Sequence, residues 1–430
     1  MTETRMSTTC DKSIGSMQKW LIIIIASISF AIFISPQLAF LGHGLRTFLP
    51  LFFAFMGITF LWKGVSVFHL LGAHALPIIA GLTFAITSFM RYLLEPNPNV
   101  LQSQVINAIV CIALWVMIII LRVNFPEAIE PVRFISLIFL GVSLGMGIPL
   151  LIERPGISRL TMGNPMADVY AAQFFPKGIA NYSWYTPVAF AFPVLANWLY
   201  KSSLNRLARM LGWVLLLAAA AATLFSTFMM AMILLIMGVL GWLFIVVLKG
   251  KKGSIRVIAM LLLFFILIVF PTIYFYSSTF GPTKYSLQKA NNFFSGLFDV
   301  GFVDADETGR TVMFIDTMKT FFNYPLFGAW GLAGKYYFIG WHSSWADMLA
   351  LQGLFGMILW LVFLSPSWKR KHPWSVEKGV AGGTLSWLLL SFGGILNPTL
   401  NSSLGLLLLW LYDGRDIWHV HDKNRKEAAR

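Results

Sequence analysis

The sequence has 430 residues, of which 57% are hydrophobic and only 12% are charged, and its mean hydropathy is +0.74. Soluble domains carry about 25% charged residues, so this composition excludes a water-soluble globular protein. The net charge of +14 does not indicate nucleic-acid binding, because the basic residues form short clusters between apolar runs, as membrane-topology signals do.

Long apolar runs without the two-residue alternation of barrel strands predict an all-α, polytopic membrane protein. A helix needs about 20 residues to cross the hydrocarbon core, and on that basis we expect about twelve spans in one membrane domain, residues 1–430. The expected spans are residues 20–35, 47–62, 65–89, 105–121, 134–152, 184–200, 211–226, 229–248, 255–276, 344–364, 379–396 and 402–412. The first span follows basic residues but precedes no small-residue cleavage site, so we interpret it as uncleaved rather than as a signal peptide.

The seventh and eighth expected spans form one continuous apolar stretch from Leu211 to Leu248. This stretch is too long for one straight span, so we place a tight turn at Ser226-Thr227, where polar residues interrupt it. With the N-terminus in the cytoplasm, most of the 32 lysines and arginines lie in cytoplasmic segments, including the tail 413–430. This bias predicts that both termini are cytoplasmic.

Two sizeable segments are then expected outside the cytoplasm, a smaller one at 153–183 and a larger one at 277–342. Connections of this length are usually functional or disordered. The larger segment is rich in Phe, Tyr, Trp and Gly rather than in Ser, Glu and Lys, which argues against disorder. We therefore expect it to fold down onto the membrane and to carry the chemistry.

The stretch from Thr308 to Phe322 predicts a short amphipathic helix, with Thr308 as its N-cap and the pair 324–325 (Tyr-Pro) as its stop. Its expected apolar face carries Phe314, Met318, Phe321 and Phe322. Arg310 falls in the first turn, where a cation opposes the helix dipole unless an anion is bound nearby. A guanidinium beside free backbone N–H groups suits a phosphate or pyrophosphate, whereas the alternative is an arginine in solvent or among lipid headgroups.

His342 stands where the larger segment is expected to return to the membrane. Histidine titrates near neutral pH, so His342 is a candidate general base. Asp347 follows within the next expected span, and acidic residues in spans are usually functional. The alternative is an interfacial histidine in an aromatic belt with Trp341 and Trp345, and an Asp347 that makes a structural hydrogen bond.

Other cations share these two segments and are candidates for binding a lipid-linked phosphate. Lys284 and Lys335 accompany Arg310 in the larger segment, and Arg154 and Arg159 lie in the smaller one. The alternative for each is an ordinary surface charge. The sequence has no Walker loop, Rossmann glycine pattern, metal cluster or nucleophile elbow, so we expect neither a nucleotide cofactor nor a metal.

The stretch 308–356 resembles the signature region of bacterial O-antigen polymerases and O-antigen ligases. The pattern reads here as Gly309-Arg310, Tyr324-Pro325, Gly328-x-x-Gly331 and His342. The ligases are similar in a further motif, which reads here as His342-Ser343, nine residues, and Gly353-x-x-Gly356. The span number, the chain length and the position of the larger segment also fit this family.

The resemblance implies a GT-C-like, metal-independent glycosyltransferase of the bacterial inner membrane. The implied donor is a glycan on undecaprenyl pyrophosphate, and the implied acceptor is a glycan or lipid A-core hydroxyl that attacks the anomeric carbon with inversion. By position in the motif, His342 is expected to assist deprotonation of the acceptor and Arg310 to bind the pyrophosphate. A chain-length regulator and a flippase are expected partners.

One motif of the ligases is missing. They usually carry Arg-x-x-x-Leu near the turn between the seventh and eighth spans, where this chain has no arginine from Phe225 to Met230. A second pyrophosphate cation is then expected from Arg154 or Arg159. This absence favours a polymerase over a ligase. The sequence His-Ser-Ser-Trp-Ala-Asp at 342–347 also looks more like that of polysaccharide polymerases. A transporter or flippase of lipid-linked sugars remains the alternative from another class, although such proteins place ionisable groups at mid-bilayer, where this sequence has essentially none.

Overall fold

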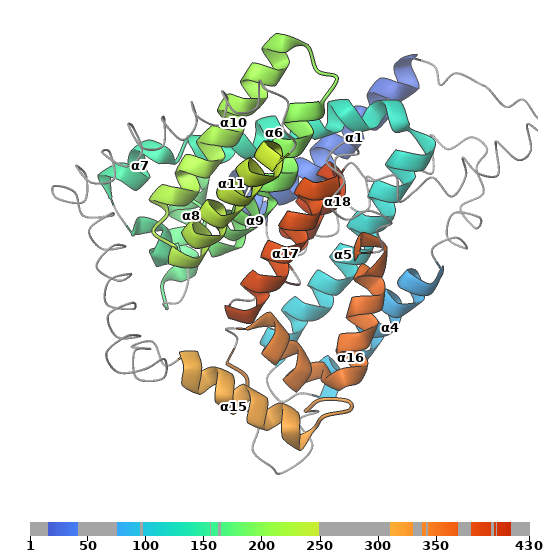
Figure 1. Ribbon diagram of the computed structural model, residues 1–430. Helices are drawn as coiled ribbons and strands as arrows, with labels where there is room; N and C mark the ends of the chain where they lie inside the picture. The colour runs from blue at the N-terminus through green and yellow to red at the C-terminus, as the bar shows by residue number, and fades with distance from the viewer. Residues whose placement is uncertain are drawn as a thin grey trace, which may run out of the picture.

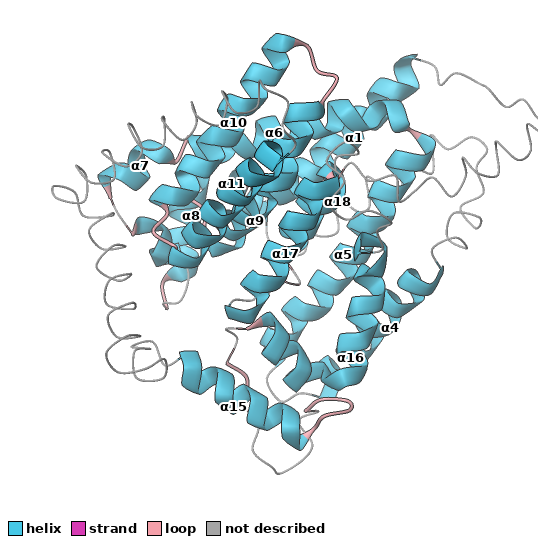
Figure 2. Ribbon diagram, viewed as in Figure 1, coloured by secondary structure: helices cyan, strands magenta, loops and turns pink. Residues whose placement is uncertain are grey.

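The computed structural model describes residues 16–41, 75–94, 98–154, 156–161, 165–248, 310–329, 338–340, 343–368, 380–396, 400 and 402–413. Within these residues the chain forms helices and the turns between them, with no strand (Figure 2). The expected all-α class is therefore confirmed for the described part. Of the expected spans, 47–62 and 255–276 lie outside it.

The long helices are α1 (Ser16–Ile34), α4 (Ala75–Leu94), α5 (Pro98–Asn124), α6 (Pro126–Gly145), α9 (Tyr182–Lys201), α10 (Arg206–Phe225), α11 (Met229–Leu248), α16 (Ser344–Trp368), α17 (Val380–Leu396) and α18 (Ser403–Tyr412). The shorter ones are η1 (Pro36–Leu41), α7 (Ile148–Glu153), η2 (Ile157–Thr161), α8 (Ala167–Phe174), η3 (Phe175–Lys177) and α15 (Arg310–Asn323). In the described part, 6 helices are long and apolar enough to cross a membrane, and three shorter apolar helices accompany them. The described part is thus that of an all-α membrane protein.

Helix α9 lies at the centre of the bundle, between α10, α11, α17 and α18 (Figure 1). Its residues 184–199 are all buried. Pro187 and Pro193 lie inside it, and the backbone N–H of Val194 donates to the hydroxyl of Ser386 at 3.1 Å. A side chain at Gly382 of α17 would meet the carbonyl oxygen of Pro193, so the small residue permits this close approach.

The division of the long apolar stretch is confirmed. Helix α10 ends at Phe225 and α11 begins at Met229. Between them Thr227 has a φ of 63°, a left-handed conformation that ends the first helix and reverses the chain. The two helices consequently form an antiparallel pair rather than one long helix.

Hydrogen bonds between helix termini define the two ends of the bundle. At one end, Lys19 near the start of α1 forms an ion pair with Glu127 at the start of α6, at 2.7 Å. At the other end, the indole N–H of Trp184 at the start of α9 donates to the carbonyl of Ile34, the last residue of α1, at 3.1 Å. We call the second end the α15 end, because α15 lies there beside the first turns of α16 (Figure 1).

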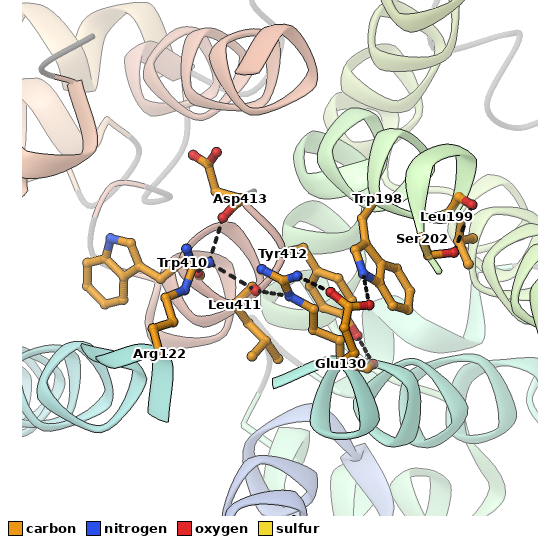
Figure 3. Close-up of polar contacts among 10 residues, drawn as sticks. Arg122, Glu130, Trp198, Leu199, Ser202, Trp410, Leu411, Tyr412 and Asp413 are labelled. Carbon is orange, nitrogen blue, oxygen red and sulfur yellow. Dashed lines mark hydrogen bonds and ion pairs between the residues drawn. The ribbon is translucent and has the colours of Figure 1, made fainter. Parts of the chain in front are cut away.

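The opposite end holds a polar cluster that secures the C-terminal helix α18 (Figure 3). Arg122 of α5 donates to the carbonyls of Trp410 and Asp413, at 2.5 and 2.6 Å, and Arg133 of α6 donates to the carbonyl of Leu411 at 2.7 Å. The last carbonyls of a helix lack partners within the helix, and arginines satisfy them while complementing the helix dipole. Glu130 pairs with Arg133 and accepts from the indole of Trp198 at 2.9 Å. One cluster therefore joins α5, α6, α9 and α18.

Candidate functional site

Some expected site residues lie in the described part of the chain and some do not. Arg310 is the first residue of α15, while Arg154, Arg159 and Asp347 are described with their side chains. His342, Lys284 and Lys335 lie outside the described residues, so their roles stay predictions. Described elements flank His342 on both sides in the sequence, α15 and segment 338–340 before it and α16 after it.

The short amphipathic helix is present as α15, which begins at Arg310 and ends at Asn323. It stops just before Tyr324 and Pro325, as expected, because proline cannot continue the backbone hydrogen bonding of a helix. The proposed cap, Thr308, lies outside the described residues. Helix α15 packs against α16 at one end of the bundle (Figure 1).

Helix α15 packs inward through two threonines and through Phe321, one of the four residues of the expected apolar face, which lies against the small cluster of Ile339, Ala350 and Leu351. Thr317 and Thr320 are 1% and 0% exposed, whereas Phe314 and Phe322 are 40% and 71% exposed. The Thr320 hydroxyl accepts from the N–H of Phe338 at 2.9 Å and lies 2.9 Å from the carbonyl of the same residue. The Thr317 hydroxyl accepts from the N–H of Gly340 at 2.8 Å. The inward side of α15 thus supplies polar partners to the backbone of 338–340, the segment that leads to His342.

The two glycine motifs meet each other. Gly353 interrupts α16 with a φ of 66° and a ψ of −171°, a conformation that is essentially restricted to glycine. The N–H groups of Leu354 and Phe355, freed by this break, donate to the carbonyls of residues 325 and 326 at 2.9 and 3.0 Å. The N–H of Ala329 donates to the carbonyl of Ala350 at 2.8 Å. The turn after α15 therefore completes the hydrogen bonding of a broken helix.

Close approach explains why both positions in this joint are glycines. A Cβ on Gly328, which has a φ of 76°, would collide with the carbonyl oxygen of Leu351. A Cβ on Gly353 would collide with the carbonyl oxygen of Leu326. We call residues 325–329 together with the break in α16 the glycine joint. It fastens α15 to α16 and so connects the two parts of the motif that flank His342.

Asp347 caps the start of α16. It is 5% exposed, and its carboxylate accepts from the backbone N–H of Ser343 at 3.2 Å. In return the Ser343 hydroxyl accepts from the N–H of Ala346 at 3.3 Å, a reciprocal arrangement like a capping box. Trp345, expected in an aromatic belt, donates its indole N–H to the carbonyl of Ser391 at 2.9 Å. These contacts hold the backbone directly after His342.

Arg159 belongs to η2, and its side chain packs against the turn between α10 and α11. Its guanidinium donates to the carbonyl of Thr227 at 2.5 Å and to the hydroxyl of the same residue at 3.3 Å. The guanidinium carbon lies 5.8 Å from the ring centroid of Phe228. Beside it, Ser158 donates its hydroxyl to the carbonyl of Ser226 at 2.6 Å. Arg159 thus reaches the turn where an arginine of the ligase motif is missing from the local sequence.

Arg154 is held differently from Arg159. Its side chain is 66% exposed and forms an ion pair with Glu153, whose carboxylate is 3.7 Å away and whose side chain is 68% exposed. Such exposed pairs contribute little to stability. Of the two arginines expected as a second phosphate-binding cation, Arg159 is therefore the one attached to the α10–α11 turn.

Sequence reasoning did not single out Arg91, in the last turn of α4. It is 0% exposed, and it stands one turn beyond Ser88, whose hydroxyl accepts from the amide of Gln352 at 3.1 Å. Gln352 directly precedes the break in α16. Burying a guanidinium is costly unless surrounding groups compensate its charge. In the sequence, the burial of Arg91 is indicated only by its place at the end of an apolar helix, three residues after Ser88.

The described part of the α15 end is therefore rich in arginine. Arg91, Arg159 and the start of α15 at Arg310 all belong to it, and Asp347 is the buried acidic residue there. Among the described residues, no group of His, Cys, Asp and Glu is arranged to hold a metal ion. Arginines with helix N-termini suit a phosphate or pyrophosphate group.

Comparisons of the chain with protein-family models, with curated proteins and with solved structures find no match. The resemblance to O-antigen polymerases and ligases accordingly rests on the motif residues in 308–356. The contact of the two glycine motifs at the glycine joint is consistent with it.

Proposed function

We propose that this protein is a membrane glycosyltransferase of the O-antigen polymerase type. It would transfer a glycan from undecaprenyl pyrophosphate to a sugar hydroxyl at the outer face of a bacterial inner membrane. The proposal includes a GT-C-like arrangement of about twelve spans, with both termini cytoplasmic and the α15 end outside. The observation that carries it is the glycine joint, which fastens α15 to α16, the two described helices that lie on either side of His342 in the sequence.

In the proposed reaction, His342 accepts the proton of the acceptor hydroxyl as its oxygen attacks the anomeric carbon. The bond between that carbon and the pyrophosphate oxygen breaks, and the configuration inverts. Negative charge builds up on the leaving pyrophosphate, where Arg310 and backbone N–H groups at the start of α15 would stabilise it. Asp347 would act through Ser343, by holding the backbone next to His342.

Arg159 is the proposed second cation for the pyrophosphate. The supporting observation is its place on the turn at Thr227, where the ligases carry their own arginine. Arg159 can occupy this place although it is far from the turn in the sequence, because Ser158 also fastens the segment 157–161 to Ser226. Lys284 and Lys335 remain candidates for contacts with the glycan or its phosphate.

The test measures glycan extension by variants of a producing strain. We expect Arg310→Ala, His342→Ala and Arg159→Ala to abolish long-chain glycan while the protein stays in the membrane. Arg154→Ala is the matched control, since it removes an exposed arginine from the same segment, and it should keep normal chains. Normal long chains in Arg310→Ala and His342→Ala would overturn the site.

Deletion of the chain separates the related alternatives. Single-repeat glycan on the final anchor indicates a polymerase. Long chains that remain on the carrier lipid indicate a ligase that transfers glycan to lipid A-core. Lipid-linked glycan trapped on the cytoplasmic side would indicate the transporter or flippase alternative instead.

A further inference from the structure

Helix α15 has three distinct sides. The inward side carries the buried Thr317 and Thr320. A second side carries apolar residues that stay exposed in the described part of the chain: Ile315 is 42% exposed and Phe322 71% exposed, and Phe314 belongs to the same side. The third side is polar, with the Asp316–Lys319 ion pair at 2.9 Å and the exposed Asn323. A helix with separate packed, apolar and charged sides is suited to a boundary between protein, lipid and water.

The exposed apolar side of α15 continues into the turn of the glycine joint. Leu326 and Phe327 are 62% and 58% exposed. The ring of Phe327 lies 5.6 Å, centroid to centroid, from the ring of Phe355 on α16. Phe355 shares an exposed face with Leu354 and Ile358 of the same helix. The apolar surface therefore runs from α15 through the turn onto α16 without interruption.

Helix α16 is one of the helices that are long and apolar enough to cross a membrane. Its exposed apolar face is thus the part of this surface that faces lipid. A soluble surface rarely exposes a contiguous patch of so many large apolar side chains. Since the patch is continuous with a lipid-facing helix and bordered by a charged side, the occupant it fits is the edge of the bilayer rather than another protein.

We propose that α15 and the turn after it form an interfacial anchor. Phe314, Ile315, Phe322 and the turn residues Leu326 and Phe327 lie among the lipid headgroups and upper acyl chains, and the side with Lys319 and Asn323 faces water. The anchor sets the depth at which α15 begins at Arg310. It also sets the depth of segment 338–340, which α15 holds through its threonines. The proposal holds whether or not the protein transfers glycans.

The test uses nitroxide labels on single cysteines in the full chain, after replacement of Cys10 and Cys111 by serine. The protein is reconstituted in vesicles of phosphatidylethanolamine and phosphatidylglycerol. Collision rates of each label are measured with oxygen, which concentrates in lipid, and with a water-soluble nickel complex. The paired variants are Phe322→Cys and Asn323→Cys, with Ile358→Cys as the lipid-facing reference.

We expect the ratio of oxygen to nickel collisions to be several-fold higher at 322 than at 323, and close to the value at 358. Phe327→Cys should follow 322, and Lys319→Cys should follow 323. Equal ratios at 322 and 323 would mean that the apolar side faces water, and low collision rates with both reagents at 322 would mean that protein covers it. Either result overturns the proposal.

Label positions are all on exposed side chains, so each variant keeps the packing of Thr317 and Thr320. Variants are compared only when they elute as one species after extraction. Phe314→Cys provides a second position on the apolar side if Phe322→Cys does not give folded protein, and the same outcomes apply to it.

Discussion

Gly353 shows how a single residue sets local structure in this protein. Its backbone conformation breaks α16, and the break exposes N–H groups that the turn after α15 then satisfies. Gly156 offers a useful contrast, since it also has a positive φ, of 78°, but nothing lies within 4 Å of the position a Cβ would take. A side chain at Gly156 would meet backbone strain alone, whereas a side chain at Gly353 would meet both backbone strain and a steric collision.

Gly353→Ala should destabilise the protein far more than Gly156→Ala. At Gly156 the alanine pays only for a left-handed backbone, about 1–2 kcal/mol. At Gly353 a similar or larger strain is joined by a collision with the Leu326 carbonyl, so the loss should exceed about 3 kcal/mol. The measurement is the temperature at which each purified variant loses its monodisperse elution. Equal losses in the two variants would contradict the glycine joint.

Two polar residues of the candidate site, Arg159 and Asp347, are also fixed by specific contacts. Arg159 is held by Thr227, 68 residues further along the chain, whereas Asp347 is held by the backbone of Ser343, four residues before it. At the residue scale, these two members of the candidate site are therefore fixed by hydrogen bonds rather than left as free surface charges.

At the scale of elements, α15 provides hydrogen-bond partners for the backbone of segment 338–340. Its buried hydroxyls replace the partners that a neighbouring strand would provide. Its exposed side, in contrast, faces away from the protein. The expected amphipathic helix exists, but its division into sides follows from what it packs against rather than from hydrophobicity alone.

Thr320→Val should loosen the segment that leads to His342. Valine keeps the shape of threonine but removes the hydroxyl, so the N–H of Phe338 loses its partner, at a cost of about 1–3 kcal/mol. Hydrogen exchange of the peptide that contains 338–340 should become faster, whereas Thr320→Ser, which keeps the hydroxyl, should leave exchange nearly unchanged. Unaltered protection in Thr320→Val would refute this role of α15.

At the scale of the whole molecule, polar contacts hold opposite ends of an apolar bundle. At the end with the proposed site, hydrogen bonds join α15 and the turn after it to segment 338–340 and to α16, and a separate set joins residues 158–159 to the α10–α11 turn. At the other end, a second network joins α5, α6 and α9 to the last helix, α18 (Figure 3). Helix α18 spans only 10 residues, and the second network adds polar partners for its last carbonyls to the burial of residues 404–412.

Arg133→Met should release α18. The substitution removes a donor from the Leu411 carbonyl and leaves the carboxylate of Glu130 without its cation, at 33% exposure. Breaking a largely buried ion pair in this way should cost about 2–4 kcal/mol. Thermal loss of the folded species should occur earlier, and adding Glu130→Gln should recover part of the loss. Arg206→Ala, which removes an exposed arginine from the first turn of α10, should have little effect.

Local sequence patterns determined much of this molecule. Composition and apolar runs established the helical membrane class, and two polar residues in a long apolar stretch located the turn at Ser226-Thr227. Proline and a helix-forming pattern located α15, whose end at Asn323 agrees with the expectation. These features depend on residues close together in the chain, so the physics that produces them is visible in the sequence.

Only the tertiary structure decided which of these features meet. The contact of Gly328 with residue 351, the reach of Arg159 to Thr227 and the burial of Arg91 all join segments far apart in the chain. The inward side of α15 was decided in the same way, because the backbone N–H groups of residues 338 and 340 take the hydroxyls of Thr320 and Thr317 as partners. Such choices depend on which unsatisfied backbone group comes within reach after folding, and a one-dimensional pattern does not contain that information.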